Sequence, residues 1–429
     1  MRRPVRWLAG VLAGLGALLA LLLWLQLRDE APSNGQNGSP TPGPIAAMPA
    51  STAEQLARGA YLARAGNCAA CHTARGGAPY AGGRAIDTPF GAVFAGNLTP
   101  DAATGLGAWN ADDFWRALHH GRSRDGRLLT PAFPYPNFTL VTRDDADALW
   151  AWLRTLPPVA QPNRPHALRW PFNTQMAQAL WRTLYFRPGS FEPDPALSAT
   201  VNRGAYLVNG LGHCGACHAS RNPLGGSGAL DDAGGSALPN QPWIAPSLTD
   251  AAAGGVPGRS ADELVRLLKT GVSARATVMG PMAEVVAGST QHLSEPDLHA
   301  MVAYLLQLPH APAPTPPART QRPPEAMARG EQLYADHCAD CHGAQGQGAP
   351  GIYPPLAGNP TVTMADARNL VRAITRGGFP PATAGNPRPY GMPGFDLPHA
   401  DLAALATWLR AAWGHDATPV MPVDVLLVR

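Results

Sequence analysis

The sequence predicts an all-α protein with three tandem domains behind an N-terminal transmembrane helix. Two observations predict this fold class: one set of helix signatures recurs three times along the chain, and the chain begins with a long apolar segment. A chain of 429 residues has room for about three domains. Its 46 glycines and 46 prolines favour long loops, whereas 45% hydrophobic residues and 11 tryptophans indicate a folded chain.

Charge and cysteine content narrow the function classes. The formal net charge is only +3, which gives no broad basic surface, so no nucleic-acid partner is expected. Six cysteines are too few for a disulfide-dense scaffold of this length. We therefore expect a loop-rich globular protein whose cores are supplemented by something other than side chains.

Residues 1–30 are expected to form a signal anchor. The run from Trp7 to Leu27 contains one polar residue, and as a helix with a rise of about 1.5 Å per residue it reaches about 30 Å, the thickness of a bilayer core. Arginines precede this run, so the positive-inside rule places the N-terminus in the cytoplasm and the rest of the chain outside it. The alternative is a secretory signal that is cleaved. Residues 31–50 are expected to be a flexible or polyproline tether.

All six cysteines lie in three copies of one motif. The copies are Cys68-Ala-Ala-Cys71-His72, Cys214-Gly-Ala-Cys217-His218 and Cys338-Ala-Asp-Cys341-His342. Two thiols at this spacing can form thioethers with the two vinyl groups of one porphyrin, and the adjacent histidine can then ligate the iron. A zinc ribbon needs paired Cys-x-x-Cys motifs without a following histidine, and a thioredoxin-like motif occurs once. The sequence therefore predicts three covalently bound heme c groups.

A helix-start signature precedes each motif. Its copies begin at Arg58-Gly59, Arg203-Gly204 and Arg329-Gly330. A glycine at this place lets two helices cross closely, and an aromatic residue of the same helix is expected to fill the contact, namely Tyr61, Tyr206 or Tyr334.

Two further helices are expected in each repeat. A middle helix ends in a glycine, a common residue after a helix C-terminus, and its copies are 114–121, 264–271 and 370–377. An amphipathic final helix follows at 145–153, 297–305 and 401–409. The aromatic residue before the last leucine of each final helix is expected in the core, with the first and final helices packed together and the heme beneath them.

The repeats set the domain boundaries. We expect domains at 51–157, 197–310 and 325–414, a connector at 158–196, a proline-rich linker at 311–324 and a tail at 415–429. The connector carries an apolar segment from Trp170 to Gly189. This segment indicates either packing between domains or a docking face for a partner.

The second axial ligand of each iron is expected on the loop between the middle and final helices. Met282 and Met392 occupy this position in the second and third repeats, and thioether sulfur favours reduced iron. Met279 is the alternative to Met282.

The first repeat departs from this pattern. Its corresponding position holds Phe133, which cannot ligate iron. His119 and His120 end the middle helix and are alternatives for the sixth ligand, and a five-coordinate first heme is the remaining one.

The chain resembles the triheme cytochrome c subunit of membrane-bound alcohol and gluconate dehydrogenases in three segments, 210–218, 280–286 and 289–293. The resemblance covers residues 51–414. It implies a periplasmic dehydrogenase as partner and electron transfer onward to quinone or a terminal oxidase. The Pro-Ala-Phe133-Pro-Tyr segment and Phe186-Arg-Pro-Gly189 resemble the variant that accompanies molybdenum hydroxylases such as isoquinoline, nicotinate or aldehyde dehydrogenases. The implied catalytic subunit is thus of the molybdenum hydroxylase or quinoprotein type.

The leading functional hypothesis is an electron-transfer subunit, not an enzyme, at the bacterial inner membrane with its heme domains in the periplasm. Two alternatives stay open. A heme enzyme such as a peroxidase would use an open distal position at the first heme. A stand-alone membrane-tethered shuttle would serve a terminal oxidase without a dedicated dehydrogenase.

Overall fold

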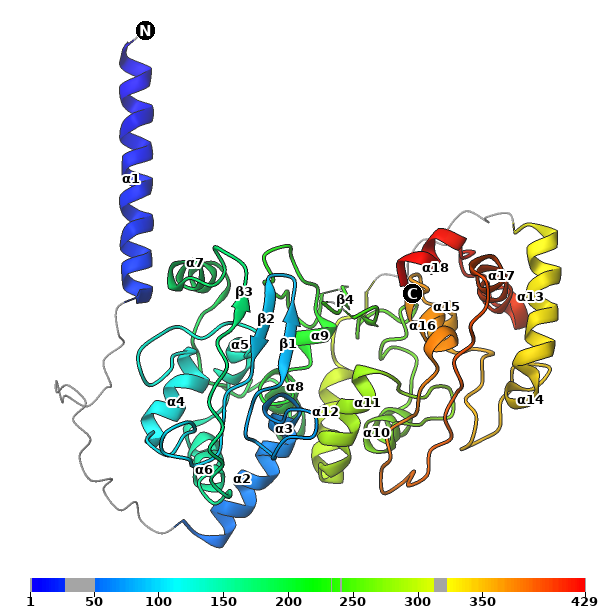
Figure 1. The fold of residues 1–429 in the computed structure, drawn as a ribbon, viewed down its shortest axis with the longest axis horizontal. Coiled ribbons are helices and arrows are strands. Elements are labelled where there is room, and N and C mark those ends of the chain that lie inside the picture. Colours follow the sequence, from blue (N-terminus) through cyan, green and yellow to red (C-terminus); the bar gives the residue numbers. More distant parts are fainter. Residues whose placement is uncertain (1, 28–50, 233, 240, 312–321, 429) are drawn as a thin grey trace. The chain divides into compact units, whose positions relative to one another are not determined.

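The computed structural model describes residues 2–27, 51–232, 234–239, 241–311 and 322–428. The chain forms two compact units, of which the first comprises Met1–Ala63 and Cys71–Glu192 and the second comprises Arg64–Ala70 and Pro193–Arg429. Helices joined by long loops dominate both units (Figure 1).

The first unit holds a three-stranded antiparallel sheet among its helices. The helices are α1 (Arg2–Leu27), α4 (Ala111–His120), α5 (Tyr135–Phe138), α6 (Arg143–Leu153) and α7 (Gln175–Tyr185), while α2 (Ala53–Ala65) and α3 (Cys68–His72) contribute residues to both units. The strands are β1 (Ala85–Thr88), β2 (Gly91–Phe94) and β3 (Ala167–Leu168). Strand β2 lies in the middle of the sheet and pairs Phe94 with Ala85 and Gly91 with Leu168.

The second unit contains the remaining elements. Its helices are α8 (Ala199–Asn209), α9 (Gly215–His218), α10 (Ala261–Thr270), α11 (Pro281–Gly288), η1 (Thr290–His292), α12 (Glu295–Leu305), α13 (Pro324–His337), α14 (Ala339–His342), α15 (Pro360–Thr363), α16 (Arg368–Arg376), α17 (His399–Leu409), η2 (Ala412–Gly414) and α18 (Pro422–Val428). Strands β4 (Ser236–Ala237) and β5 (Ile244–Ala245) pair antiparallel.

The short strands are a difference from the predicted all-α fold. In the described part of the chain they are two to four residues long. Segments of this length show no alternation of apolar and polar residues that sequence reasoning can use. The fold is therefore mostly helical, with two small sheets added to the predicted helices.

Helix α1 covers the run from Trp7 to Leu27 that the sequence predicts to be helical. Among the residues that the structure describes, no helix combines the length and the apolar character needed to cross a membrane. The expected tether, residues 31–50, and residues 312–321 of the expected linker lie outside the described residues.

The predicted close crossing of the first and final helices is confirmed in all three repeats. A Cβ added to the glycine of the first helix would overlap a carbonyl oxygen of the final helix, at 2.0 Å for Gly59 and Ala148, 1.9 Å for Gly204 and Ala300, and 2.4 Å for Gly330 and Ala404. The helices α2 and α6, α8 and α12, and α13 and α17 thus meet where only glycine fits.

An ion pair joins the same two helices in each repeat. The pairs are Arg58–Asp145, Arg203–Asp297 and Arg329–Asp401. Arg203 donates from two nitrogens to the two carboxylate oxygens of Asp297, each at 2.8 Å, and Arg329 binds Asp401 in the same bidentate way. Bidentate geometry fixes the angle between the partners as well as their distance.

The expected aromatic contacts lie at the edge of this crossing. Tyr206 and Tyr334 are buried, as the sequence predicts. Trp408 is only partly buried, and its ring lies 4.8 Å from that of Tyr334. The expectation that this aromatic residue lies in the core is therefore only partly met: the following leucine, Leu409, takes the buried position, while the Trp408 ring lies against Tyr334 and Trp413.

Candidate heme-binding sites

Each Cys-x-x-Cys-His motif forms one short helical turn. The first two turns follow a residue in the left-handed region, Asn67 with φ 49° and His213 with φ 37°. This backbone ends the preceding helix and redirects the chain into the motif. In every motif the first cysteine is partly buried and the second is exposed. Two cysteines three residues apart in a helical turn lie on one face of it, which is what attachment to one porphyrin requires.

Neither the second nor the third motif closes a disulfide. The sulfur atoms of Cys214, Cys217, Cys338 and Cys341 are thus available for attachment to another group. Burial raises the pKa of Cys214 to about 12 and that of Cys338 to about 11, with a smaller contribution from the neighbouring cysteine. Before attachment, the thiols of Cys214 and Cys338 are therefore protonated at neutral pH. Within the described ranges, no group of three or more His, Cys, Asp or Glu side chains is placed to hold a metal ion.

The histidine of every motif makes the same hydrogen bond. Its ring Nδ1 meets a backbone carbonyl oxygen, at 2.7 Å for His72 and Gly96, 2.7 Å for His218 and Pro246, and 2.9 Å for His342 and Pro354. Because a carbonyl oxygen only accepts, Nδ1 carries the proton and Nε2 is left with its lone pair. A second-nitrogen bond of this kind is typical of metal-ligating histidines.

Burial acts on the same histidines. It lowers the pKa of His72, His218 and His342, and the bond to the carbonyl opposes this shift without overcoming it. The rings are thus neutral at neutral pH, which is the form that ligates a metal. The residues present therefore fit a heme c group: two thiols on one turn and one neutral, oriented imidazole.

The three carbonyl oxygens were not predicted from the sequence. They lie 24, 28 and 12 residues after their histidines. This variable spacing hides them from any fixed motif. A weak signal exists in the first two repeats, where Gly96-Asn-Leu-Thr and Pro246-Ser-Leu-Thr align.

Met392 lies in the loop between α16 and α17. Its backbone forms an antiparallel bridge with Gly378, with N–O distances of 2.8 and 2.9 Å. Its side chain packs, partly buried, against the hydrophobic core of the third repeat, and Cys338 packs against the same core. The structure thus brings the predicted sulfur ligand and one predicted attachment cysteine to one apolar cluster.

Met282 does not lie on a loop, contrary to the expectation from the sequence, but is the second residue of α11, directly after Pro281. The alternative, Met279, is engaged elsewhere, because its Cε lies 2.9 Å from the place that a Cβ on Gly378 would take. Both methionines are partly buried. The packing of Met279 favours Met282 as the ligand.

The first repeat has a different arrangement around the methionine position. Phe133 is partly buried, and its ring lies 5.3 Å from that of Phe138 in α5. The Nδ1 of His119 lies 2.9 Å from the carbonyl oxygen of Thr139, the residue after α5. His119 also stacks on Trp115, with ring centroids 4.5 Å apart. The structure thus brings Phe133 and His119 to the same short helix.

His120 lies beside His119. The two rings meet edge to face with centroids 4.6 Å apart, at the end of α4 where Gly121 adopts the left-handed conformation. The tautomer of His119 is set by Thr139 in the same way as that of His72 is set by Gly96. His119 therefore offers Nε2 as the lone-pair nitrogen.

Comparison with known proteins gives consistent matches. The cytochrome c family profile matches residues 56–157 and 327–413. The chain is 37% identical over 407 residues to the alcohol dehydrogenase (quinone), cytochrome c subunit, of Gluconacetobacter polyoxogenes, covering 90% of this chain and 86% of the relative. It is 36% identical over 396 residues to the gluconate 2-dehydrogenase cytochrome c subunit of Pantoea cypripedii, covering 87% and 89%. It is also 38% identical over 425 residues to a nicotinate dehydrogenase subunit of Pseudomonas putida, covering 96% of this chain but 34% of the relative.

Proposed function

The chain belongs to the family of cytochrome c subunits of dehydrogenases, and on that premise we propose that it carries electrons from a periplasmic catalytic subunit to quinone or a terminal oxidase. Its relatives are named as cytochrome c subunits of dehydrogenases, so the chain is an electron-transfer subunit rather than a catalytic enzyme. Membership of this family also implies covalently bound heme c.

We propose three heme c groups, one for each motif. The observation that carries this is the threefold recurrence of one histidine–carbonyl bond, at His72, His218 and His342. When bound, heme c supplies the reversible one-electron chemistry of its iron. The cysteine thiols provide the covalent attachment, and the histidine Nε2 provides the proximal ligand. Gly96, Pro246 and Pro354 keep each Nδ1 protonated and hold the ring in place.

The distal residues set the sites apart. Met282 and Met392 are the proposed sulfur ligands in the second and third domains, and a thioether raises the reduction potential. Phe133 offers no ligand in the first domain, so His119, His120 or an open position takes that place. We propose that the first domain has the lowest potential and that electrons enter there.

The proposed partner is a catalytic subunit of the molybdenum hydroxylase or quinoprotein type. The similarity to the nicotinate dehydrogenase subunit and the phenylalanine at position 133 favour the former, and the similarity to the quinone-linked alcohol dehydrogenase subunit favours the latter. We also propose that the apolar run Trp7–Leu27 attaches the chain to the bacterial inner membrane, with domains 51–157, 197–310 and 325–414 in the periplasm.

Isolation of the tagged full chain from native membranes in mild detergent tests this proposal. We expect a dehydrogenase subunit to copurify, and we expect addition of its substrate to give the absorbance of reduced heme. A chain with Cys68→Ser and Cys71→Ser is the control and should lose only the contribution of the first heme. A chain that isolates alone and is reduced by no dehydrogenase in those membranes would contradict the proposal and favour the stand-alone shuttle.

A further inference from the structure

Helix α7 turns its apolar side outward. Met176, Leu180 and Leu184 are 51%, 41% and 53% exposed. Their spacing of four residues places them in one stripe along the helix. An ordinary surface helix buries such a stripe against the core and exposes its polar side. We call Met176, Leu180 and Leu184 the α7 stripe.

The polar side of α7 is fixed inside the first unit. Arg182 is 1% exposed, donates to Gln26 Oε1 at 3.1 Å and donates to the carbonyl oxygen of His120. Its guanidinium also lies over the ring of Phe186, 4.7 Å from the centroid. A rotation that buries the α7 stripe would pull this charged group out of its contacts. The outward orientation is therefore built into the fold.

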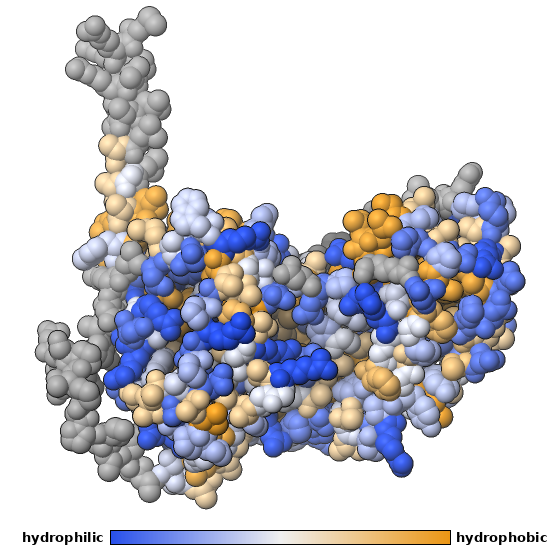
Figure 2. Space-filling model, in the orientation of Figure 1, coloured by the Kyte–Doolittle hydropathy of each residue, from blue (hydrophilic) through white to orange (hydrophobic). Residues whose placement is uncertain are grey.

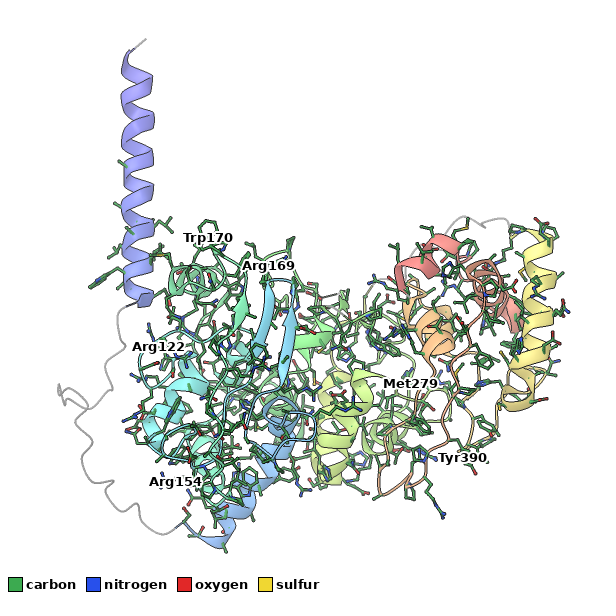
Figure 3. The ribbon with its side chains drawn as sticks, viewed as in Figure 1. Arg122, Arg154, Arg169, Trp170, Met279 and Tyr390 are labelled. Carbon is green, nitrogen blue, oxygen red and sulfur yellow. The ribbon has the colours of Figure 1, made fainter. Side chains whose placement is uncertain are left out.

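Residues of the type found at membrane interfaces surround the α7 stripe. Trp170 is 81% exposed and lies just before the helix, beside Arg169 (Figure 3). Arg187 follows the helix and is exposed. Tryptophan is enriched at the level of lipid headgroups, and arginines at the ends of an apolar stripe reach lipid phosphates. This combination matches anionic lipid in both polarity and charge.

Helix α1 also carries exposed apolar side chains. Helix α1 packs against α7, and Gln26 accepts hydrogen bonds from Arg182 through its side chain and from Arg122 through its backbone. Exposed leucines and Trp24 lie in the C-terminal part of α1. Figure 2 shows hydrophobic surface at this lower end of the helix. Both helices therefore expose apolar side chains in the first unit.

We propose that the α7 stripe and Trp170 insert in the plane of the membrane, between the headgroups and acyl chains of the periplasmic leaflet. The contact needs no membrane-crossing helix, because an amphipathic helix binds lipid by lying on the surface. The inference rests on the proposed membrane location. It adds a second attachment point, which fixes the orientation of the first unit above the bilayer.

Photo-crosslinking of the full chain tests the inference. Benzoylphenylalanine replaces Leu184, and the protein is placed in vesicles of equal parts phosphatidylethanolamine and phosphatidylglycerol. We expect phospholipid adducts at position 184 at about ten times the yield at position 144 of α6. Asp144 is exposed in the first turn of α6, and α6 lies at the opposite end of the first unit from α7 (Figure 1). In a chain that also carries Met176→Gln and Leu180→Gln, we expect the adduct at position 184 to fall about tenfold while the heme absorbance stays unchanged.

The outcomes separate the inference from the proposed function. The same probe at Leu22 of α1 reports on membrane attachment itself. Lipid adducts at position 22 but not at position 184 would overturn the α7 contact and leave the anchor standing. The absence of adducts at both positions would overturn both. A protein adduct at position 184 in native membranes, in place of a lipid adduct, would overturn the inference by identifying the α7 stripe as a partner interface.

Discussion

The first and third repeats have the same frame and different distal sides. In both, a glycine crossing and an arginine–aspartate pair join the first and final helices, and a backbone carbonyl holds the motif histidine. In the third repeat the distal loop supplies Met392, bridged to Gly378. In the first repeat the same place holds Phe133, packed on Phe138 of α5.

The two repeats thus share the residues that would hold the heme and differ in the residues that would set its reduction potential. The shared features position the attachment helix and the histidine, which any heme c site needs. The features that differ lie on the other side, where the ligand sets the potential. A chain of similar units can therefore hold iron centres of unequal potential without a change of scaffold.

The largest effect is expected from the shared histidine. His72→Ala and His342→Ala should each remove the native electron paramagnetic resonance signal of one of three hemes, whether that signal is low-spin or high-spin, because each deletes the proximal ligand of one site. Electron paramagnetic resonance together with heme content per chain measures this. Equal losses in the two variants support a common proximal side, whereas a loss confined to one of them would break the comparison.

The second-largest effect is expected from substitution of the glycine at the helix crossing. Gly59→Ala places a Cβ on the carbonyl oxygen of Ala148 and is expected to lower the free energy of unfolding of the first unit by about 3 kcal/mol. Gly189→Ala is the matched control, because nothing lies within 4 Å of its added Cβ. Denaturant unfolding measures both. Equal stability of the two variants would argue against a close crossing.

The distal difference predicts an asymmetric result. Met392→Ala should lower the potential of one heme and remove about half of the methionine–iron charge-transfer intensity, because only two of the sites are proposed to have a sulfur ligand. Phe133→Ala should change neither quantity. Redox titration followed optically distinguishes them, and a similar drop in potential in both variants would show that position 133 acts on the iron.

The smallest effect is expected from the exposed ion pair of the third repeat. The hydrogen bond from Arg329, aided by its charge, lowers the pKa of Asp401 below 3.8. The ionised carboxylate therefore stabilises the fold above about pH 4, and this contribution is lost as the pH falls through the lowered pKa. Asp401→Asn should remove this part of the pH dependence, which denaturant midpoints at several pH values measure. A variant with the full acid dependence of the original chain would assign it to other groups.

The features of this fold that depend on periodicity or on motifs can be predicted from the sequence. The helix ends at Gly121, Gly271 and Gly377 follow from the preference for glycine after a C-terminus, and the structure places α4, α10 and α16 there. The arginine–aspartate pairs were missed, although Arg-Gly and an aspartate recur in one register of every repeat. A pair such as Arg203–Asp297 joins residues 94 apart, and such distances are set by packing rather than by local pattern.

The candidate sites also contain some residues that the sequence predicts and others that only the structure reveals. The attachment cysteines and histidines could be identified because their chemistry demands a fixed spacing. The carbonyl partners and the packing of Met279 against Gly378 depend on loops of variable length, so only the structure reveals them. For the apolar segment that contains α7, the sequence left packing and docking as alternatives, since an apolar stripe in sequence looks the same whether it faces the core or the solvent.

Near-infrared magnetic circular dichroism of the oxidised full chain, normalised to heme content, tests the central claim most directly. We expect three hemes per chain with a methionine–iron band of the intensity of two. The remaining heme, that of the first repeat, should show either a bis-histidine band or high-spin iron. A methionine band with the intensity of three hemes would contradict the proposed difference between the first repeat and the other two.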